Sequence, residues 1–538
     1  MLIKDFSFQE LPFSDLFKTY VSDFEKLTSF YETNPFSETD IESRISSFDF
    51  SNDRSTSISL LRRINKTYNV HEEALKNLDR LKEKDALAIV TGQQLGVYSG
   101  PLYTILKTIS TIHLANKIEK KTGKPVVPVF WLADEDHDYE EIRSIAVING
   151  DNPQTFSLPA KNGALPPVAE MQYSSAINKL KEEVKEAQFN TDFTDKLWEV
   201  LDRNFAEGKR FDHAFGGFIA DLFSKHGLVI AGSNHPEIKQ MTRECMKSAI
   251  AQADKIRTAL QEQTDAISKK FSQQVTLYDS NLFYLDEDSG RVKISRNGDG
   301  WKTDSGQEWT SDELIAEIDE TPELFSPNVF LRPVMQDQML PTLGYVAGPG
   351  EIAYYGQMKT FYHQFDMKMP VIFPRLSATL IEPAIDRIMG EVPFEMQEFG
   401  QRIEDLESQF VERTEQTDIE AVFDSWQGNI ESVSEKPISN IAQIDPTLEA
   451  AAEKAHQVFS NELDKLKGKV YRSVKAQEET QLKRIRRIQN HLFPNRTLQE
   501  RTISGIYFMN KYGNDIWDRV LDSLDSEDDF ANHKLIYL

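Results

Sequence analysis

The fold of this chain is decided between residues 86 and 138, which open on ALAIVTGQQ at 86–94 and close on VVPVFWLADEDHD at 126–138. Each stretch starts with a short apolar run that suits a buried strand and ends in glycine or charged residues. Between them a helix is predicted from Pro101 to about Lys121, because Gly123 and Pro125 stop it. The stretch is therefore a strand, helix, strand unit with parallel strands.

Two later stretches repeat the pattern of an apolar run followed by a turn. The run at 228–231 precedes a turn at 232–234, and the run at 371–373 precedes Pro374 and Arg375. We therefore expect an α/β fold with four or more parallel strands. Because the carboxyl ends of parallel strands share one edge of a sheet, the loops that follow the first two strands should face one cleft.

The remaining segments predict the domain organisation. The core should extend over residues 1–378, with helices at its start and segments inserted near 150–225 and 260–327. Residues 379–500 are predicted to be helical, and the proline-free stretch 447–493 spaces its apolar residues as a coiled coil does. The last segment, 501–538, is expected to pack a helix back on the core.

Composition limits the function classes. The 538 residues carry 61 Lys and Arg against 86 Asp and Glu, a net charge of −25, which disfavours nucleic acid and anionic membranes as partners. The single cysteine, Cys245, excludes a disulfide within the chain. The start resembles no signal peptide, and no run of about 18 apolar residues could span a membrane. We expect a cytoplasmic protein.

A glycine-rich turn between the first strand and the helix is the first candidate site. Glycine backbone N–H groups and a helix N-terminus favour an anion such as phosphate or carboxylate. The turn matches neither the dinucleotide nor the Walker pattern, so a turn without a ligand stays an alternative. The candidate nucleotide- or anion-binding residues are Gly92, Gln93, Gln94, Gly96, Ser99, Gly100, Tyr103, Thr104 and Lys107.

An acidic loop follows the second strand and includes Asp134, Glu135, Asp136 and His137. Carboxylates and an imidazole can hold Mg²⁺ with nucleotide phosphates, or bind and deprotonate an amine. The alternative is a solvated negative loop in a chain that is acidic throughout. Its position at the sheet edge where ligands bind favours a functional loop.

A third candidate begins at Arg332 and reaches a second glycine turn. Arg332 can grip a carboxylate with two hydrogen bonds, and the turn with Gly348 and Gly350 precedes a helix. The alternative is an internal ion pair, and Arg375 carries the same ambiguity. The candidate substrate-binding residues are Arg332, Gly348, Gly350, Glu351, Tyr354 and Arg375.

Together these motifs resemble the bacillithiol biosynthesis BshC family, the cysteine ligases that join cysteine to glucosaminyl-malate. The segments that carry the resemblance are 91–94 with 99–104, 128–131 with 135–138, and 332–333 with 347–351. The resemblance implies a Rossmann-like core with inserted connecting-peptide segments and a homodimer formed through the C-terminal coiled coil. It also implies that an amide forms between the cysteine carboxylate and the glucosamine amine.

The resemblance also suggests roles for the candidate residues. Since amide formation in water is uphill, we expect ATP or ADP as the nucleotide, with Mg²⁺ as a candidate companion and no metal ligand assigned. His137, with Asp136 and Glu135, would bind or deprotonate the amine, and Arg332 or Arg375 would hold a malate carboxylate. Two rivals are a metal-dependent hydrolase that uses Asp134, Asp136 and His137, and a nucleotide-binding coiled-coil scaffold.

Overall fold

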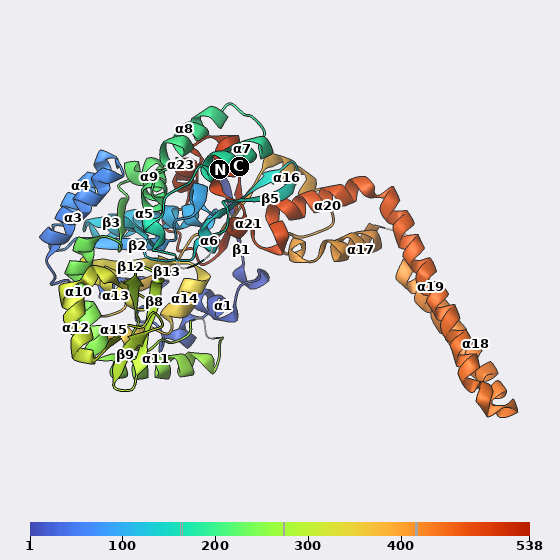
Figure 1. Ribbon diagram of the computed structural model, residues 1–538. Helices are drawn as coiled ribbons and strands as arrows, with labels where there is room; N and C mark the ends of the chain where they lie inside the picture. The colour runs from blue at the N-terminus through green and yellow to red at the C-terminus, as the bar shows by residue number, and fades with distance from the viewer. Residues whose placement is uncertain (162, 164, 273–274, 415–417) are drawn as a thin grey trace. The chain divides into compact units, whose positions relative to one another are not determined.

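The computed structural model describes residues 1–161, 163, 165–272, 275–414 and 418–538. The chain divides into two compact units. The first, called the core unit here, contains residues 1–380 and 499–538, and the second, the helical unit, contains residues 381–498. Figure 1 colours them along the chain. Within the described residues, no helix is both long and apolar enough to cross a membrane.

A five-stranded parallel sheet forms the centre of the core unit, in the order β13-β12-β2-β3-β6. Its strands are β2 Leu87–Gln93, β3 Val126–Leu132, β6 Val229–Gly232, β12 Thr342–Ala347 and β13 Val371–Pro374. The sequence predicted four of them and the parallel direction, and both are confirmed. The prediction omitted β12, whose short apolar run directly precedes the second glycine turn.

Helix α5, Tyr103–Thr122, packs on β2 and β3 and confirms the predicted helix. Every residue from Thr104 to Ala115 is buried, since the sheet lies on one side and the C-terminal segments on another. Gly123 ends the helix in the left-handed conformation, with φ 69°.

The two predicted insertions carry structure of their own. The first begins before the predicted start near 150 and consists of a hairpin and helices: α6 Tyr139–Ile142, β4 Ser144–Asn149, β5 Asn152–Ser157, α7 Ala176–Ala187, α8 Thr194–Asn204 and α9 Phe211–Phe223. The second follows α10 Pro236–Ala251 and α11 Ala253–Ser268 and is mostly antiparallel: β7 Leu282–Asp286, β8 Gly290–Asn297, β9 Gly300–Thr303, β10 Glu308–Trp309, α12 Ser311–Glu320 and β11 Phe325–Pro327. Helices α13 Leu331–Met339, α14 Pro349–Tyr355 and α15 Lys359–His363 connect it to the last sheet strands.

The two ends of the chain pair with each other in the core unit (Figure 1). Strand β1, Leu2–Phe6, runs antiparallel to β15, His533–Tyr537, and β14, Ala378–Ile381, completes this small sheet. The N-terminal helices follow as α1 Asp15–Ser22, α2 Glu38–Ser46, α3 Arg54–Thr67 and α4 Glu72–Arg80. The predicted C-terminal helix is two helices, α22 Gly505–Tyr512 and α23 Ile516–Ser523, because Gly513 adopts φ 92° between them.

The helical unit is built around a long antiparallel hairpin of α18 Ile419–Ile444 and α19 Glu449–Gln477 (Figure 1). Its other helices are α16 Pro383–Met389, α17 Ile403–Thr414 and α20 Glu479–Leu492. The single helix predicted over 447–493 is therefore divided at Glu478. A small core of Val411, Ile419 and Phe423 packs against the side chains of Val470 and Val474.

Candidate functional site

A cavity of about 590 Å³ lies in the core unit beyond the carboxyl ends of β2, β3 and β12. Residues from both predicted loops line it, which confirms that these loops face one cleft. The cavity also receives side chains from the second insertion and from the C-terminal segment. Its lining residues include Gly92, Gln93, Gln94, Tyr103, Lys107, Glu135, Asp136, Glu141, Tyr278, Phe283, Arg291, Arg332, Tyr345, Gly348, Gly350, Glu351, Tyr354, Arg375 and Arg501.

The first glycine turn divides into a part at the cavity and a part held by the C-terminal segment. Gly92, Gln93 and Gln94 line the cavity. Beyond them the turn is bound to the C-terminal segment: Ser504 Oγ donates to Tyr98 O at 3.0 Å, and Leu102 N donates to Ile503 O at 2.8 Å. The N–H at the start of α5 is thus already satisfied by the protein.

The backbone of this turn is strained. Tyr98 and Ser99 have φ values of 47° and 76°, and Gly100 follows at 63°. Residues with side chains rarely adopt this conformation, and the surrounding contacts must hold it. A Cβ on Gly96 would lie 3.0 Å from the Cα of Gly100, so the turn requires glycine for its close approach. Gly96, Ser99, Gly100 and the buried Thr104 therefore shape the turn.

The buried Lys107 and the partly buried Glu351 form an ion pair in the lining of the cavity. Lys107 Nζ lies 2.6 Å from Glu351 Oε2, 2.6 Å from Gly92 O and 3.3 Å from Gln93 Oε1. These three acceptors match the three protons of the ammonium group. Glu351 also accepts from Gly348 N at 2.7 Å and from Tyr345 Oη at 2.8 Å. The second glycine turn is therefore capped by its own glutamate.

The first two carboxylates of the acidic loop, Asp134 and Glu135, have different hydrogen-bond partners. Asp134 Oδ1 accepts from the N–H groups of Ser233 and Asn234 at 2.9 and 3.1 Å, and burial raises the pKa of Asp134 to about 7. Glu135 is buried and accepts a hydrogen bond from the buried Lys239. Among the described residues, Glu135 Oε2 has no hydrogen-bond partner. Glu135 thus combines a cavity-lining position with a buried carboxylate oxygen that lacks a hydrogen-bond partner among the described residues.

Asp136 and His137 lie at the edge of the cavity. Asp136 Oδ2 accepts from Gln94 Nε2 at 2.7 Å, and although burial opposes it, hydrogen bonds to His137 and Gln94 hold the pKa of Asp136 below its ordinary value. His137 Nδ1 is 3.6 Å from Asp136 Oδ1 and 3.4 Å from Arg291 Nη1, and its side chain is 48% exposed. Asp136 is thus an ionised carboxylate with a half-exposed imidazole beside it.

Two arginines offer N–H groups in this cavity. Arg332 Nη1 donates to Gln336 Oε1 at 3.0 Å, and its guanidinium lies 5.8 Å from the centre of the Tyr345 ring. Arg291 packs on Phe283 and donates to Ser326 Oγ and Pro327 O at 2.9 and 2.7 Å. Burial lowers the pKa of Arg291 to about 10. Both keep further N–H donors, since a guanidinium has five.

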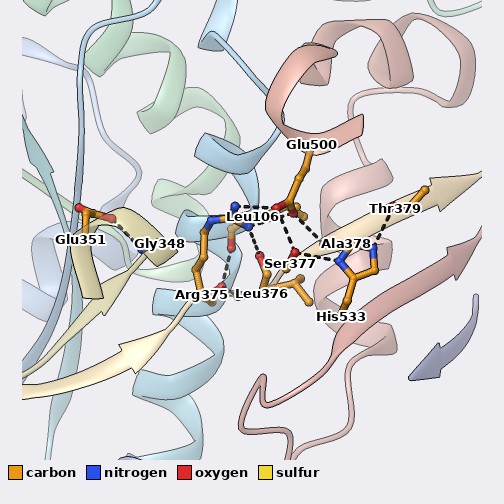
Figure 2. A network of polar contacts seen from close by, with 11 residues as sticks. Leu106, Gly348, Glu351, Arg375, Leu376, Ser377, Ala378, Thr379, Glu500 and His533 are labelled. Atoms are coloured by element: carbon orange, nitrogen blue, oxygen red, sulfur yellow. Dashed lines mark hydrogen bonds and ion pairs between the residues drawn. The ribbon is translucent and has the colours of Figure 1, made fainter. Parts of the chain in front are cut away.

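Arg375 has an internal carboxylate partner, Glu500 (Figure 2). Its Nη1 and Nη2 donate to the two oxygens of Glu500 at 2.9 and 2.6 Å, and both side chains are buried. Glu500 also accepts from Ser377 Oγ at 3.0 Å and from Ala378 N at 2.9 Å. Of the two alternatives for Arg375, the internal ion pair is the one present.

Four of the charged groups at this site were absent from the sequence-based candidates: Lys239, Arg291, Glu500 and Arg501. Lys239 and Arg291 come from α10 and from the second insertion, and Glu500 and Arg501 from α21 Gln499–Thr502. In the sequence these residues lie outside the three candidate loops, although Lys239 follows the predicted strand at 228–231 and Arg291 follows Gly290. Glu500 and Arg501 lie in a stretch of mixed polar and apolar residues, 498–506, in which no apolar run marks a site.

Within the part of the chain that the structure describes, no group of three or more His, Cys, Asp or Glu side chains could hold a metal ion. The set Asp134, Asp136 and His137, which the hydrolase interpretation requires, is therefore not assembled as a ligand group. Asp134 instead accepts from backbone N–H groups.

Parallel strands with a polar-lined cavity beyond their carboxyl ends define a Rossmann-like α/β protein that binds small molecules. The model for the N-terminal Rossmann-like domain of bacillithiol biosynthesis BshC matches residues 1–376, and the model for its C-terminal coiled-coil domain matches residues 378–538. The chain belongs to the BshC family.

Similar proteins share nearly the whole length of the chain. A Salinibacter ruber protein is 31% identical over 97% of this chain and 96% of its own length. A Koribacter versatilis protein is 30% identical over 94% and 95%, and a Bacillus cereus protein is 29% identical over 84% and 85%. Each of these relatives carries the name "Putative cysteine ligase BshC".

Proposed function

We propose that this protein is an amide-forming ligase that joins the carboxylate of cysteine to the glucosamine amine of glucosaminyl-malate. The observation that carries the proposal is the cavity, which combines the carboxylates of Glu135 and Asp136 with the guanidinium of Arg332. An amine substrate that also bears carboxylates needs both kinds of group. The relatives' shared name supports the choice of cysteine.

The two carboxylates suit different roles toward the amine. Asp136 stays ionised because its pKa is lowered, so it can bind the substrate as an ammonium ion. Glu135 Oε2, unpartnered among the described residues, can accept the proton that the nitrogen loses when it attacks the cysteine carbonyl carbon. The C–N bond forms as the bond to the leaving group breaks. His137 would orient Asp136.

A nucleotide would supply the leaving group that makes the cysteine carboxylate reactive. The donors of the glycine turns do not fit its phosphates well, because Lys107, Leu102 N and Gly348 N already serve protein acceptors. The remaining N–H groups of Arg291 fit a phosphate better and lie beside the acidic loop. We propose ATP, with any Mg²⁺ carried by its phosphates, and Arg332 for a malate carboxylate.

The test is ligation by the purified chain supplied with cysteine, glucosaminyl-malate and ATP, with mass spectrometry of the thiol product. Bacillithiol formation that needs all three supports the proposal. Glu135→Gln should lower kcat, whereas Asp136→Asn should raise KM for glucosaminyl-malate, and His137→Ala should have the smallest effect. No product with any nucleoside triphosphate would contradict the proposed ligation.

We also propose that the hairpin of the helical unit pairs with a second copy. Large apolar side chains are exposed along it: Val422 48%, Trp426 47%, Val433 73%, Ile444 83%, Leu448 47%, Val458 54%, Phe459 63% and Leu466 40%. An exposed apolar stripe of this length is typical of an interface. Light scattering should find a dimer, and Val433→Glu with Phe459→Glu should give a folded monomer. A wild-type monomer would contradict the proposal.

A further inference from the structure

The C-terminal segment contributes a cation to the cavity that the proposed roles leave unused. Arg501 lines the cavity and is exposed to solvent. It makes no hydrogen bond or ion pair with any residue that the structure describes. The other cations of the lining have protein partners, as Lys107 has Glu351 and Arg375 has Glu500. Arg501 therefore differs from them in keeping its full hydrogen-bonding capacity.

The backbone that carries Arg501 is held on both sides by buried contacts. Before it, Gln499 bonds both the N–H and the carbonyl of Leu380, at 2.8 and 3.0 Å, and Glu500 binds Arg375 (Figure 2). After it, Ile503 and Ser504 are completely buried against the first glycine turn. A fixed backbone reduces the entropy lost when a side chain orders on a ligand. An unpaired guanidinium on such a backbone is prepared for an anionic partner.

The neighbours of Arg501 place it on the side of the cavity formed by Tyr103. Burial and Glu141 raise the pKa of Tyr103, whereas Arg501 and Arg375 lower it. Arg375 is neutralised by Glu500, and Glu141 is a cavity carboxylate whose own pKa is raised by burial. An anion bound at Arg501 would therefore meet an uncompensated positive charge next to the aromatic ring and hydroxyl of Tyr103.

We infer that Arg501 is a substrate-binding residue that holds a carboxylate of the acceptor substrate. A planar guanidinium matches a carboxylate with two parallel hydrogen bonds. The identification of this carboxylate as one of the two in the malate group rests on the proposed function, with Arg332 for the other. The segment that follows the helical unit then takes part in substrate recognition.

The test is calorimetric titration of the full-length protein with three probes: L-malate, glucosaminyl-malate and methyl glucosaminide, which lacks a carboxylate. Arg501→Ala should weaken binding of both carboxylate probes about tenfold and leave methyl glucosaminide unchanged, since a hydrogen bond to a charged group is lost. Arg501→Lys should recover part of the affinity, because it restores the charge without the planar fork. Added salt should reduce the difference between wild type and Arg501→Ala.

Arg519→Ala is the matched control, because Arg519 is also an exposed arginine of the C-terminal segment but lies outside the cavity lining, 3.4 Å from Asp515. It should bind every probe as the wild type does. Equal affinity of Arg501→Ala and wild type for the carboxylate probes, or no binding of either probe by the wild type, would overturn the inference. Loss of carboxylate binding in Arg501→Ala, combined with no ligation by the wild type, would support Arg501 and contradict the proposed ligation.

Discussion

Two regions of the same cavity differ in whether their cationic side chains pair with carboxylates of the protein. In the internally paired region, Arg375 pairs with Glu500 and Lys107 pairs with Glu351, and the N–O distances of these contacts are 2.9, 2.6 and 2.6 Å. In the open region, Arg332 has neutral partners, Gln336 and Tyr354, and Arg501 has none among the described residues. The comparison shows that an arginine in a cavity lining indicates an anion-binding site only when no carboxylate of the protein already pairs with it.

The largest effect is expected in the internally paired region. Glu500→Ala should lower the free energy of unfolding by about 3–5 kcal/mol, because it leaves the buried Arg375 charge without a partner. Urea denaturation measures this. The double variant Arg375→Met, Glu500→Leu should lose much less, since no charge stays buried. A cost below about 1 kcal/mol for the single variant would show that Arg375 finds another partner.

The buried Asp134 should make the free energy of unfolding of the protein depend on pH. Burial raises the pKa of Asp134 to about 7. The protonated carboxyl group therefore contributes its full stabilisation of the folded state below about pH 4, and this stabilisation is lost as the pH rises through 7. Between pH 5 and pH 8, the unfolding free energy of wild type should therefore fall by about 2 kcal/mol more than that of Asp134→Asn. Urea denaturation at several pH values tests this, and parallel curves for the two proteins would contradict it.

Arg332→Gln should have the opposite signature to Glu500→Ala. It should weaken binding of glucosaminyl-malate by roughly tenfold to a hundredfold, as expected for a lost charged hydrogen bond. Its free energy of unfolding should stay within about 1 kcal/mol of wild type, because the hydrogen-bond partners of Arg332, Gln336 and Tyr354, are neutral. Calorimetry and urea denaturation of the same sample separate the two. A large loss of stability without a change in affinity would show that Arg332, like Arg375, stabilises the fold and does not bind the substrate.

The smallest effect should follow from Ser377→Ala. Its hydroxyl donates to Glu500 and lies 2.8 Å from His533 Nδ1 (Figure 2). Glu500 keeps Arg375 and the N–H of Ala378, so the loss should be about 1 kcal/mol. Thermal unfolding measures it. A cost equal to that of Glu500→Ala would mean that the network depends on the hydroxyl as much as on the ion pair.

Much of the core could be predicted because its elements are local in sequence. Strands β2 and β3 and helix α5 follow from apolar runs and from the stop at Gly123. Strand β12 was missed, since a run of six residues within a glycine-rich segment has no period that separates strand from loop. The division of the long C-terminal helix at Glu478 has no sequence signal, because no glycine or proline stands there.

The sequence by itself determined the parallel α/β core, the helical region and the presence of three polar loops, because periodicity and glycine turns are encoded by neighbouring residues. It also carried the motifs by which the chain resembles its family. Only the tertiary structure decided which charged groups pair. Arg375 and Glu500 are 125 residues apart, and Lys107 and Glu351 are even further apart in the sequence, so no local pattern links them. Which charged groups form ion pairs across such distances depends on how the strands and the C-terminal segment pack together. In this packing, Arg332 and Arg501 have no carboxylate partner among the described residues and stay available to a ligand.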